Sequence, residues 1–475
     1  MQAVKRWVLL FCVLVSCSSA VSAQGPEQTK QLARDIFKQL IEINTTDSVG
    51  NVTTSAEAMA TRLRDGGFAE DDIHVAGPNE RKKNLVVRLH GTGKRRPLLF
   101  IGHLDVVEAR REDWTTDPFE FIEKDGYFYG RGTEDMKAGD AILVTNFIRL
   151  KKEGYVPDRD VILALTADEE GGTSNGVDWL LKQHRDWIDA EYCINLDGGE
   201  FEKDKDKRLL AGVQASEKVY VDFQFESLNP GGHSSIPSPD NAIYHLAGAL
   251  ARLQSFSFPV KINEITRNYF ERNVALTTGQ VAADLKAVAH QPPDNAAVQR
   301  LSANPYLNSL LHTTCVATML SGGHAANALP QTARANVNCR IFPGEDPQDV
   351  LHALERVAND PKVKVSIVAQ IGPDGKVTPV VAVPPSPLLP EVTQAMEKTL
   401  SLTWPGVPYV TTMSTGATDG KYMRIAGIPT YGISCLFFQR NDSRAHGKDE
   451  RLGVQDFYDG VEFNYKLIKE LSEPR

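Results

Sequence analysis

The chain has few of the features that mark membrane proteins or nucleic-acid-binding proteins. Among its 475 residues, the one long apolar run lies near the N-terminus and is too short to span a bilayer, so we expect no transmembrane helix. The net charge of −9 argues against binding to nucleic acid or to an anionic membrane surface.

Cysteine is also scarce, with six residues in the whole chain. Two of them, Cys12 and Cys17, lie in the N-terminal leader, and none forms a Cys-x-x-Cys pair. The other four lie in apolar, β-rich runs and are Cys193, Cys315, Cys339 and Cys435. A chain of this length can bury a large core without a disulfide framework, so we expect these four to be small buried hydrophobic side chains.

The remaining composition is typical of a soluble globular protein, with 41% hydrophobic and 24% charged residues. The length predicts two or three domains. Lys5-Arg6, the apolar run that follows and a small-residue cleavage site at Ala23 predict a signal peptide over residues 1–23. We therefore expect an exported protein, periplasmic or secreted. Alternatively, residues 14–17 resemble a bacterial lipobox, in which Cys17 would carry a lipid anchor.

The mature chain is organised around the segment Ile101-Gly-His-Leu-Asp-Val-Val107. The apolar run 97–101 predicts a parallel strand that is buried on both faces. His103 and Asp105 lie two residues apart at its carboxyl end, so their side chains should face one site. Open α/β sheets bind ligands at such ends. A chance meeting of the two side chains in a solvated loop is the alternative.

Five more potential ligands follow predicted strands or lie in polar or glycine-rich loops: Asp135, Glu169, Glu170, Asp197 and His446. Asp135 precedes a predicted helix, where it could bind a ligand or only cap the helix. Adjacent carboxylates at one strand end, such as Glu169 and Glu170, repel each other unless a cation compensates; a solvated acidic loop is the alternative. Two histidines with several carboxylates suit a pair of divalent ions, with zinc as first choice and Co²⁺ or Mn²⁺ as substitutes.

The order of predicted elements indicates two kinds of domain. Strands alternate with helices over 24–213 and again over 371–475, which predicts one α/β catalytic domain with a mostly parallel sheet, built from both segments. Residues 214–370 predict an inserted α+β domain with the ferredoxin-like order β-α-β-β-α-β. Residues 255–312 have weak periodicity, and we predict no fold for them.

Six motifs, in their order along the chain, resemble a known family of two-zinc peptidases and amidohydrolases. The family includes glutamate carboxypeptidase, carboxypeptidase S, aminoacylase, acetylornithine deacetylase and succinyl-diaminopimelate desuccinylase. The motifs are GHLDVV, GRGTEDMKAGDA, TADEEGG, INLDGGE, GGHSSIP and RAHG. The chain resembles the carboxypeptidase S-like branch most, because of GGHSSIP and the long segment before Thr313.

This resemblance implies a role for each candidate residue. The metal ligands would be His103 and Asp197 for one zinc ion, Glu170 and His446 for the other, and Asp135 as the bridge, followed by a cis peptide. Asp105 would orient His103. Glu169 would be the general base that takes a proton from the metal-bridging water and passes it to the leaving nitrogen.

The resemblance also implies that the inserted domain is a lid and can form a homodimer. His233 in that domain would help to hold the oxyanion, often across the dimer; an exposed loop histidine is the alternative. The substrate-binding residues would be Asn327, Arg340, Gly416 and Thr418. Arginine suits a bidentate grip on a carboxylate, although Arg340 could also be a surface charge on a strand.

The expected function is an exported zinc-dependent hydrolase, of carboxypeptidase or dipeptidase type, that cleaves an amide bond next to a free carboxylate. Its substrate would be a small peptide. An N-acyl amino acid is the alternative substrate, as for an aminoacylase or deacetylase. A non-catalytic binding protein on this scaffold would have lost Glu169 or a metal ligand, and a two-metal phosphoesterase would have more His and Asn ligands.

Overall fold

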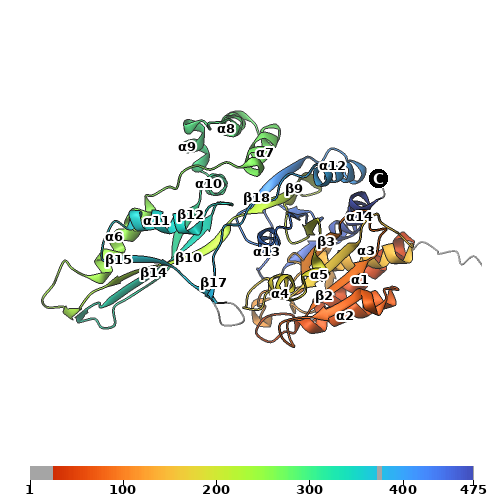
Figure 1. The fold of residues 1–475 in the computed structure, drawn as a ribbon, viewed down its shortest axis with the longest axis horizontal. Coiled ribbons are helices and arrows are strands. Elements are labelled where there is room, and N and C mark those ends of the chain that lie inside the picture. The colour runs from red at the N-terminus through yellow and green to blue at the C-terminus, as the bar shows by residue number, and fades with distance from the viewer. Residues whose placement is uncertain (1–24, 372–376, 474–475) are drawn as a thin grey trace, which may run out of the picture.

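The computed structural model describes residues 25–371 and 377–473. Figure 1 shows an elongated molecule, with a large sheet and its helices at one end and a smaller sheet at the other. The predicted signal peptide and Cys17 lie outside the described residues. No helix in the described part of the chain is long and apolar enough to cross a membrane.

The large sheet has ten strands and is parallel at its centre. Its order is β1-β2-β6-β3-β7-β19-β9-β8-β20, and β18 also pairs with β9. The strands are β1 Ile73–Ala76, β2 Asn84–Leu89, β3 Leu98–His103, β6 Val161–Thr166, β7 Tyr192–Asn195, β8 Phe201–Asp204, β9 Lys207–Glu217, β18 Tyr409–Ser414, β19 Thr430–Gly432 and β20 Phe438–Gln439. β3 is parallel to both β6 and β7, and every residue of β3 and β6 is buried, as the apolar runs predict.

Helices cover both faces of this sheet (Figure 1). One hydrophobic core contains residues of α1 Pro26–Glu42, α2 Val52–Asp65, α3 Lys137–Lys152, α12 Pro390–Thr403 and α14 Val454–Ser472. A second core contains residues of α4 Gly176–Gln183, α5 Arg185–Ile188 and α13 Gly420–Ile425. Successive residues of β3 alternate between the two cores, because Phe100 lies in the first core and Leu99 in the second. The mixed α/β class predicted from the sequence is confirmed.

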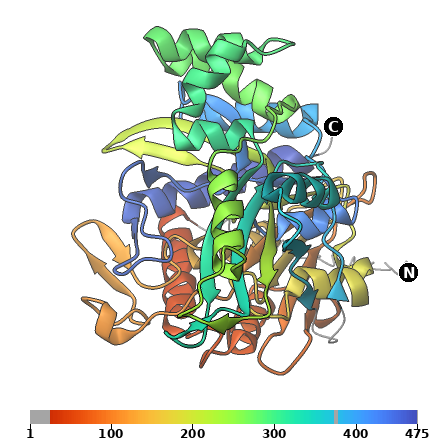
Figure 2. The same cartoon turned by 90° about the vertical axis from the view of Figure 1, so that its left-hand side faces the viewer.

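The smaller sheet is antiparallel, with the order β12-β14-β10-β15. Its strands are β10 Val219–Leu228, β12 Thr314–Gly322, β14 Thr332–Ile341 and β15 Val363–Ile367, and its helices are α6 Ala242–Gln254 and α11 Pro347–Ala358. In chain order this is the predicted β-α-β-β-α-β unit. Figure 2 views the molecule from the end that carries this sheet. The chain passes from β9 through Lys218 directly into β10, so one continuous segment joins the two sheets.

The segment without a sequence-based prediction is helical. It contains α7 Glu264–Asn273, the 3₁₀ turn η3 Val274–Leu276, α8 Gly279–Ala289, α9 Asn295–Ser302 and α10 Pro305–Leu311. α7 packs on β18 of the large sheet, where the Thr411 hydroxyl donates a hydrogen bond to the backbone oxygen of Ile265 at 3.2 Å. α7 therefore lies against the large sheet, although the sequence inserts it between two elements of the smaller one, and α8 packs on α7.

Short strands and turns complete the structure. The sheet β21-β5-β4 consists of Arg451–Gly453, Tyr127–Tyr129 and Ile122–Lys124. Two further pairs are β11 Gly232–His233 with β13 Ala328–Leu329, and β16 Gln370–Ile371 with β17 Val377–Thr378. Two 3₁₀ turns are η1 Glu70–Asp72 and η2 Arg111–Asp113.

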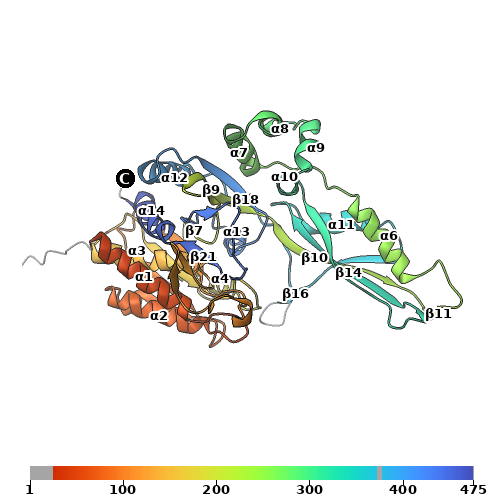
Figure 3. The same cartoon turned by 180° about the vertical axis from the view of Figure 1, so that it is seen from behind.

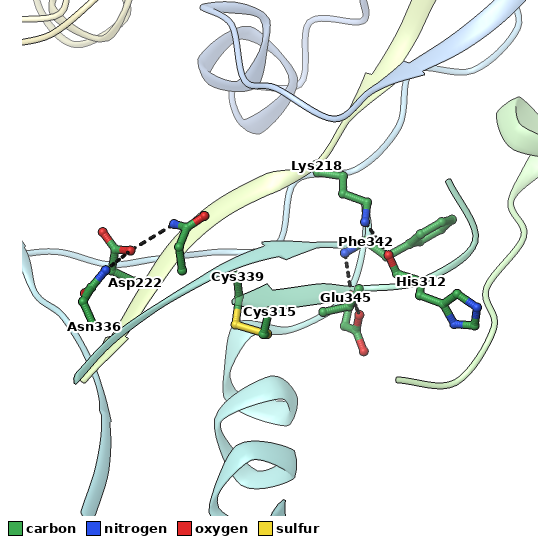
Figure 4. Close-up of a disulfide and its surroundings, with 10 residues drawn as sticks. Lys218, Asp222, His312, Cys315, Asn336, Cys339, Phe342 and Glu345 are labelled. Carbon is green, nitrogen blue, oxygen red and sulfur yellow. Dashed lines mark hydrogen bonds between the residues drawn. A yellow bond between two sulfur atoms is a disulfide. The ribbon is translucent and has the colours of Figure 1, made fainter. Parts of the chain in front are cut away.

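The expectation that all four mature cysteines are unpaired is wrong for two of them. Cys315 of β12 and Cys339 of β14 form a disulfide across the antiparallel pair (Figure 4). The two residues are direct partners in the register, with their Cα atoms 4.1 Å apart. The sequence does not specify this register, and that is why the pairing was missed. Cys193 and Cys435 are free and buried, as expected.

Candidate active site

Three neighbouring strands of the large sheet end at one site. β3 ends at His103, Glu169 and Glu170 follow β6, and Asp197 follows β7. Because β3 pairs in parallel with both β6 and β7, the carboxyl ends of all three strands lie side by side. The topology thus brings together residues that are far apart in the sequence.

Two loops bring the remaining candidates to the same edge. Asp135 lies between β5 and α3, and its two carboxylate oxygens contact two different histidines. Asp135 Oδ1 is 3.0 Å from Nε2 of His103, and Asp135 Oδ2 is 3.0 Å from Nε2 of His446. The N-cap residue of α3 is Met136, so Asp135 does not cap that helix. The peptide bond between Asp135 and Met136 is cis, as the resemblance implied.

The potential metal donors form two groups that share Asp135. The first group is His103, Asp135 and Asp197, and the second is Asp135, Glu170 and His446. In each group the donor atoms lie within 4.8 Å of one another. Imidazole nitrogens and carboxylate oxygens without a thiolate suit a pair of divalent transition ions, and the donor set therefore fits two metals.

Asp105 connects the metal donors to the acidic loop after β6. Nδ1 of His103 donates a hydrogen bond to the backbone oxygen of Asp105 at 3.0 Å, which leaves Nε2 free to face the carboxylates. The Asp105 carboxylate accepts hydrogen bonds from the backbone N–H groups of Glu169 at 3.1 Å and Glu170 at 3.0 Å. It therefore fixes the backbone of the predicted general base and of the neighbouring ligand.

The electrostatics of the site favour a bound cation. Burial raises the pKa of the Glu169 carboxyl well above its usual range, and burial also raises the pKa of Asp197. For Asp135, hydrogen bonds from His103 and His446 outweigh burial and hold the pKa well below its usual range. Carboxylates crowded in this way repel one another, and divalent ions would relieve that repulsion.

A cavity of about 380 Å³ begins at Asp135 and Asp197. Its apolar lining residues are Met136, Leu196, Phe201, Leu436 and Phe438. Polar and charged residues line the rest of it, among them Glu200, Glu202, Gln214 and Arg440. A cavity of this size is typical of a small-molecule site.

Comparison with known proteins shows to which protein family this chain belongs. The model of peptidase family M20/M25/M40 matches residues 99–470, which include every donor of both groups. The chain belongs to this family. This confirms the resemblance seen in the motifs, and the chain is a metallopeptidase or amidohydrolase.

Individual proteins similar to this chain include a carboxypeptidase S-like protein, an N-fatty-acyl-amino acid synthase/hydrolase and an M20 metallo-carboxypeptidase. The chain is 28% identical to probable carboxypeptidase S-like 2 of Dictyostelium discoideum, over 79% of this chain and 71% of that protein. It is also 28% identical to the human N-fatty-acyl-amino acid synthase/hydrolase PM20D1, over 78% of this chain and 74% of that protein. Among solved structures, the M20 family metallo-carboxypeptidase Sso-CP2 from Sulfolobus solfataricus covers 92% of this chain and 99% of its own, with a TM-score of 0.67 and 15% identity. The last likeness shows a shared fold.

Three of the residues matched to substrate-binding positions lie near the junction of the two sheets. Nη1 of Arg340, on β14, donates a hydrogen bond to the backbone oxygen of Thr415 at 3.4 Å. Gly416 follows directly in the same loop, and its backbone N–H bonds the Ser414 hydroxyl at 3.0 Å. Thr418 lines the cavity, and its hydroxyl bonds Glu217 at 2.8 Å.

The other two matched residues lie elsewhere. His233 is exposed on β11, and the backbone oxygen of Asn327 accepts a hydrogen bond from the neighbouring Ser234 at 3.1 Å. Figure 3 shows β11 at the far end of the smaller sheet, away from the large sheet. The structure therefore brings His233 and Asn327 together, but not to the metal donors of the same chain.

Sequence reasoning missed several buried residues around the site. Asp419 accepts hydrogen bonds from the Thr166 hydroxyl at 3.0 Å and from the Asn175 amide at 2.6 Å, and burial raises its pKa to about 6. Lys82 pairs with Asp168, which directly precedes Glu169. The only sequence signal for Asp168 and Asp419 is that each is next to a candidate site residue, Glu169 and Thr418 respectively. Lys82 has no such signal.

Proposed function

We propose that this chain is an exported two-zinc hydrolase that cleaves an amide bond next to a free carboxylate, as a carboxypeptidase or dipeptidase does. The observation that carries the proposal is the position of Asp135, with one oxygen 3.0 Å from each of the two histidine Nε2 atoms. A carboxylate in this position can bridge two ions that act together on one scissile bond.

The proposed roles follow from the two donor groups. His103 and Asp197 would hold one zinc ion, Glu170 and His446 the other, and Asp135 would join them. When bound, the two ions would lower the pKa of a water molecule and polarise the substrate carbonyl. Zinc is the first choice of metal because it binds imidazole nitrogen and carboxylate oxygen, and both donor groups consist of these atoms.

Glu169 is proposed as the general base. Among the described residues neither donor group includes it, while Asp105 anchors its backbone N–H at 3.1 Å. Its carboxylate is therefore available to take a proton from water and to pass that proton to the leaving nitrogen. Burial raises the pKa of this carboxyl, which favours the protonated form that returns the proton to the leaving nitrogen.

The substrate side chain is proposed to occupy the cavity beside Asp135 and Asp197, with Arg340 gripping the free carboxylate. An N-acyl amino acid is the second candidate substrate. The similarity to a protein named N-fatty-acyl-amino acid synthase/hydrolase favours it. Both substrates present an amide next to a carboxylate, so one catalytic centre serves either.

A chromatographic screen tests the function. Zinc-loaded protein is incubated with dipeptides that vary in the C-terminal residue and with N-acyl amino acids that vary in acyl length, beside chelator-treated protein. We expect metal-dependent release from the dipeptides. Release from N-acyl amino acids alone would establish the second candidate, and no metal-dependent release from either set would refute the proposed function.

We also propose that residues 214–370 act as a lid and homodimerise, between catalytic segments 24–213 and 371–475. An exposed apolar surface on α6 and the edge strand β12 supports this: Ile243, Tyr244, Val316, Met319 and Leu320. Such an edge strand is a ready pairing surface for another chain. The Cys315–Cys339 disulfide supports export, because disulfides persist in oxidising compartments.

In such a dimer, His233 of one chain would complete the site of the other, as its position far from its own metal donors suggests. His233→Ala and Glu169→Gln proteins should each be nearly inactive. After mixing and exchange of subunits, about a quarter of the wild-type activity should return, because half of the dimers then hold one intact site. Activity that stays at the level of the separate variants after confirmed exchange would show that His233 does not act across the dimer.

A further inference from the structure

Two carboxylates fasten together the two loops that carry Asp135 and His446. Glu450 lies four residues after His446 and is fully buried. Its Oε1 accepts hydrogen bonds from the backbone N–H groups of Glu134 at 2.6 Å and Asp135 at 3.1 Å. Its Oε2 accepts from the backbone N–H of Gly132 at 3.1 Å and from Nη1 of Arg131 at 2.6 Å. This carboxylate therefore accepts four hydrogen bonds, all from donors of residues 131–135.

Glu134 makes the reverse connection. It directly precedes Asp135, and its carboxylate oxygens accept from the backbone N–H of Arg444 at 3.0 Å. Oε2 also accepts from the backbone N–H of Ala445 at 3.1 Å and from the Ser443 hydroxyl at 3.3 Å. Each loop thus supplies a carboxylate that binds the backbone of the other. We call Glu134 and Glu450 the clasp.

We propose that the clasp residues are positioning residues that hold the donor group Asp135, Glu170 and His446 in shape and thereby set its affinity for its metal ion. This inference rests on the proposed two-metal centre. Neither clasp residue is itself a ligand, since their oxygens are used on N–H and O–H donors. The clasp residues act on the metal ion through the backbone that carries Asp135 and His446, which are two of the three ligands in this group.

The need for a clasp differs between the two donor groups. His103 is 1% exposed and is mounted on β3, which is fixed by two neighbouring strands. His446 lies in a loop, its side chain is 54% exposed, and its backbone φ of 62° is unfavourable for a residue with a Cβ. Hydrogen bonds from the adjacent residues Arg444 and Ala445 to Glu134 therefore contribute to keeping His446 in place. Loss of the clasp should weaken the second group more than the first, because the clasp holds two ligands of the second group and only Asp135 of the first.

The test compares Glu134→Gln and Glu450→Gln with wild type and with Glu112→Gln, a change of an exposed carboxylate on η2. Glutamine keeps the size of the side chain but turns an amide donor toward backbone N–H groups. Metal-free proteins are titrated with Zn²⁺ by calorimetry and with Co²⁺ by visible absorption. We expect one ion to bind the clasp variants about 10- to 100-fold more weakly than wild type, and the other ion to be weakened less. Glu112→Gln should bind both ions as wild type does.

Amide hydrogen exchange of the metal-free proteins tests the clasp without any metal. Exchange at residues 132–135 should accelerate in Glu450→Gln and exchange at 444–445 in Glu134→Gln, with no change in Glu112→Gln. Wild-type affinities for both ions and wild-type exchange rates in the clasp variants would overturn the inference. If the buried Glu450→Gln variant does not fold, as judged by near-UV circular dichroism, the half-buried Glu134→Gln decides. A wild-type protein that takes up fewer than two ions refutes the two-metal centre, and the exchange rates then decide on the clasp alone.

Discussion

Replacing Glu169 with glutamine should lower kcat by about 10²- to 10⁴-fold, the usual contribution of a positioned general base, with both metal ions still bound. The amide cannot take a proton from water, but it is nearly the same size as the carboxylate. The backbone contact to Asp105 is made by the Glu169 N–H, so the substitution leaves it unchanged. The measurement is kcat on the best substrate of the screen, together with metal content by mass spectrometry.

Two comparisons make this prediction specific to the base. Glu112→Gln, at an exposed position, should keep wild-type turnover. Glu170→Gln changes a residue of the second donor group and should lose metal as well as turnover. If Glu169→Gln kept full turnover, Glu169 could not be the base. If it lost metal, its main role would be that of a ligand.

The sequence predicted the parts of the fold that local pattern determines. β3 and β6 are short apolar runs without polar alternation, and such runs indicate strands covered on both faces. The six-element unit around β10 and β14 was predicted from the order of its elements. The helices between α6 and β12 were not, because they share their buried side chains among several short amphipathic segments rather than one long periodic run.

The candidate site was predictable for a related reason. Strand assignments place His103, Glu170 and Asp197 at carboxyl ends of strands, where an open α/β sheet binds its ligands. That the three strands are neighbours is seen only in the sheet order. His446 follows no such strand, and its place depended on the resemblance of motifs. The disulfide and the clasp depend on register and loop conformation, which single-sequence patterns do not specify.

Asp135→Asn should weaken metal binding more than a substitution in only one donor group, because Asp135 belongs to both donor groups. Asparagine offers one oxygen and one amide nitrogen, and a protonated amide nitrogen does not bind metal. Only one of the two histidine-facing positions can then keep an oxygen ligand. We expect binding of no more than one ion and a loss of kcat of at least about 10²-fold, the scale of losing one group that stabilises developing charge.

The matched comparison for this prediction is Asp197→Asn, which changes only the first group. It should weaken one ion and leave Asp135, Glu170 and His446 able to bind the other. Calorimetric titration of the metal-free proteins separates the cases, since it counts ions as well as measuring affinity. Two tightly bound ions in Asp135→Asn would mean that Asp135 is not the bridge, because the contacts of its two oxygens with two different histidines would then have no bearing on metal binding.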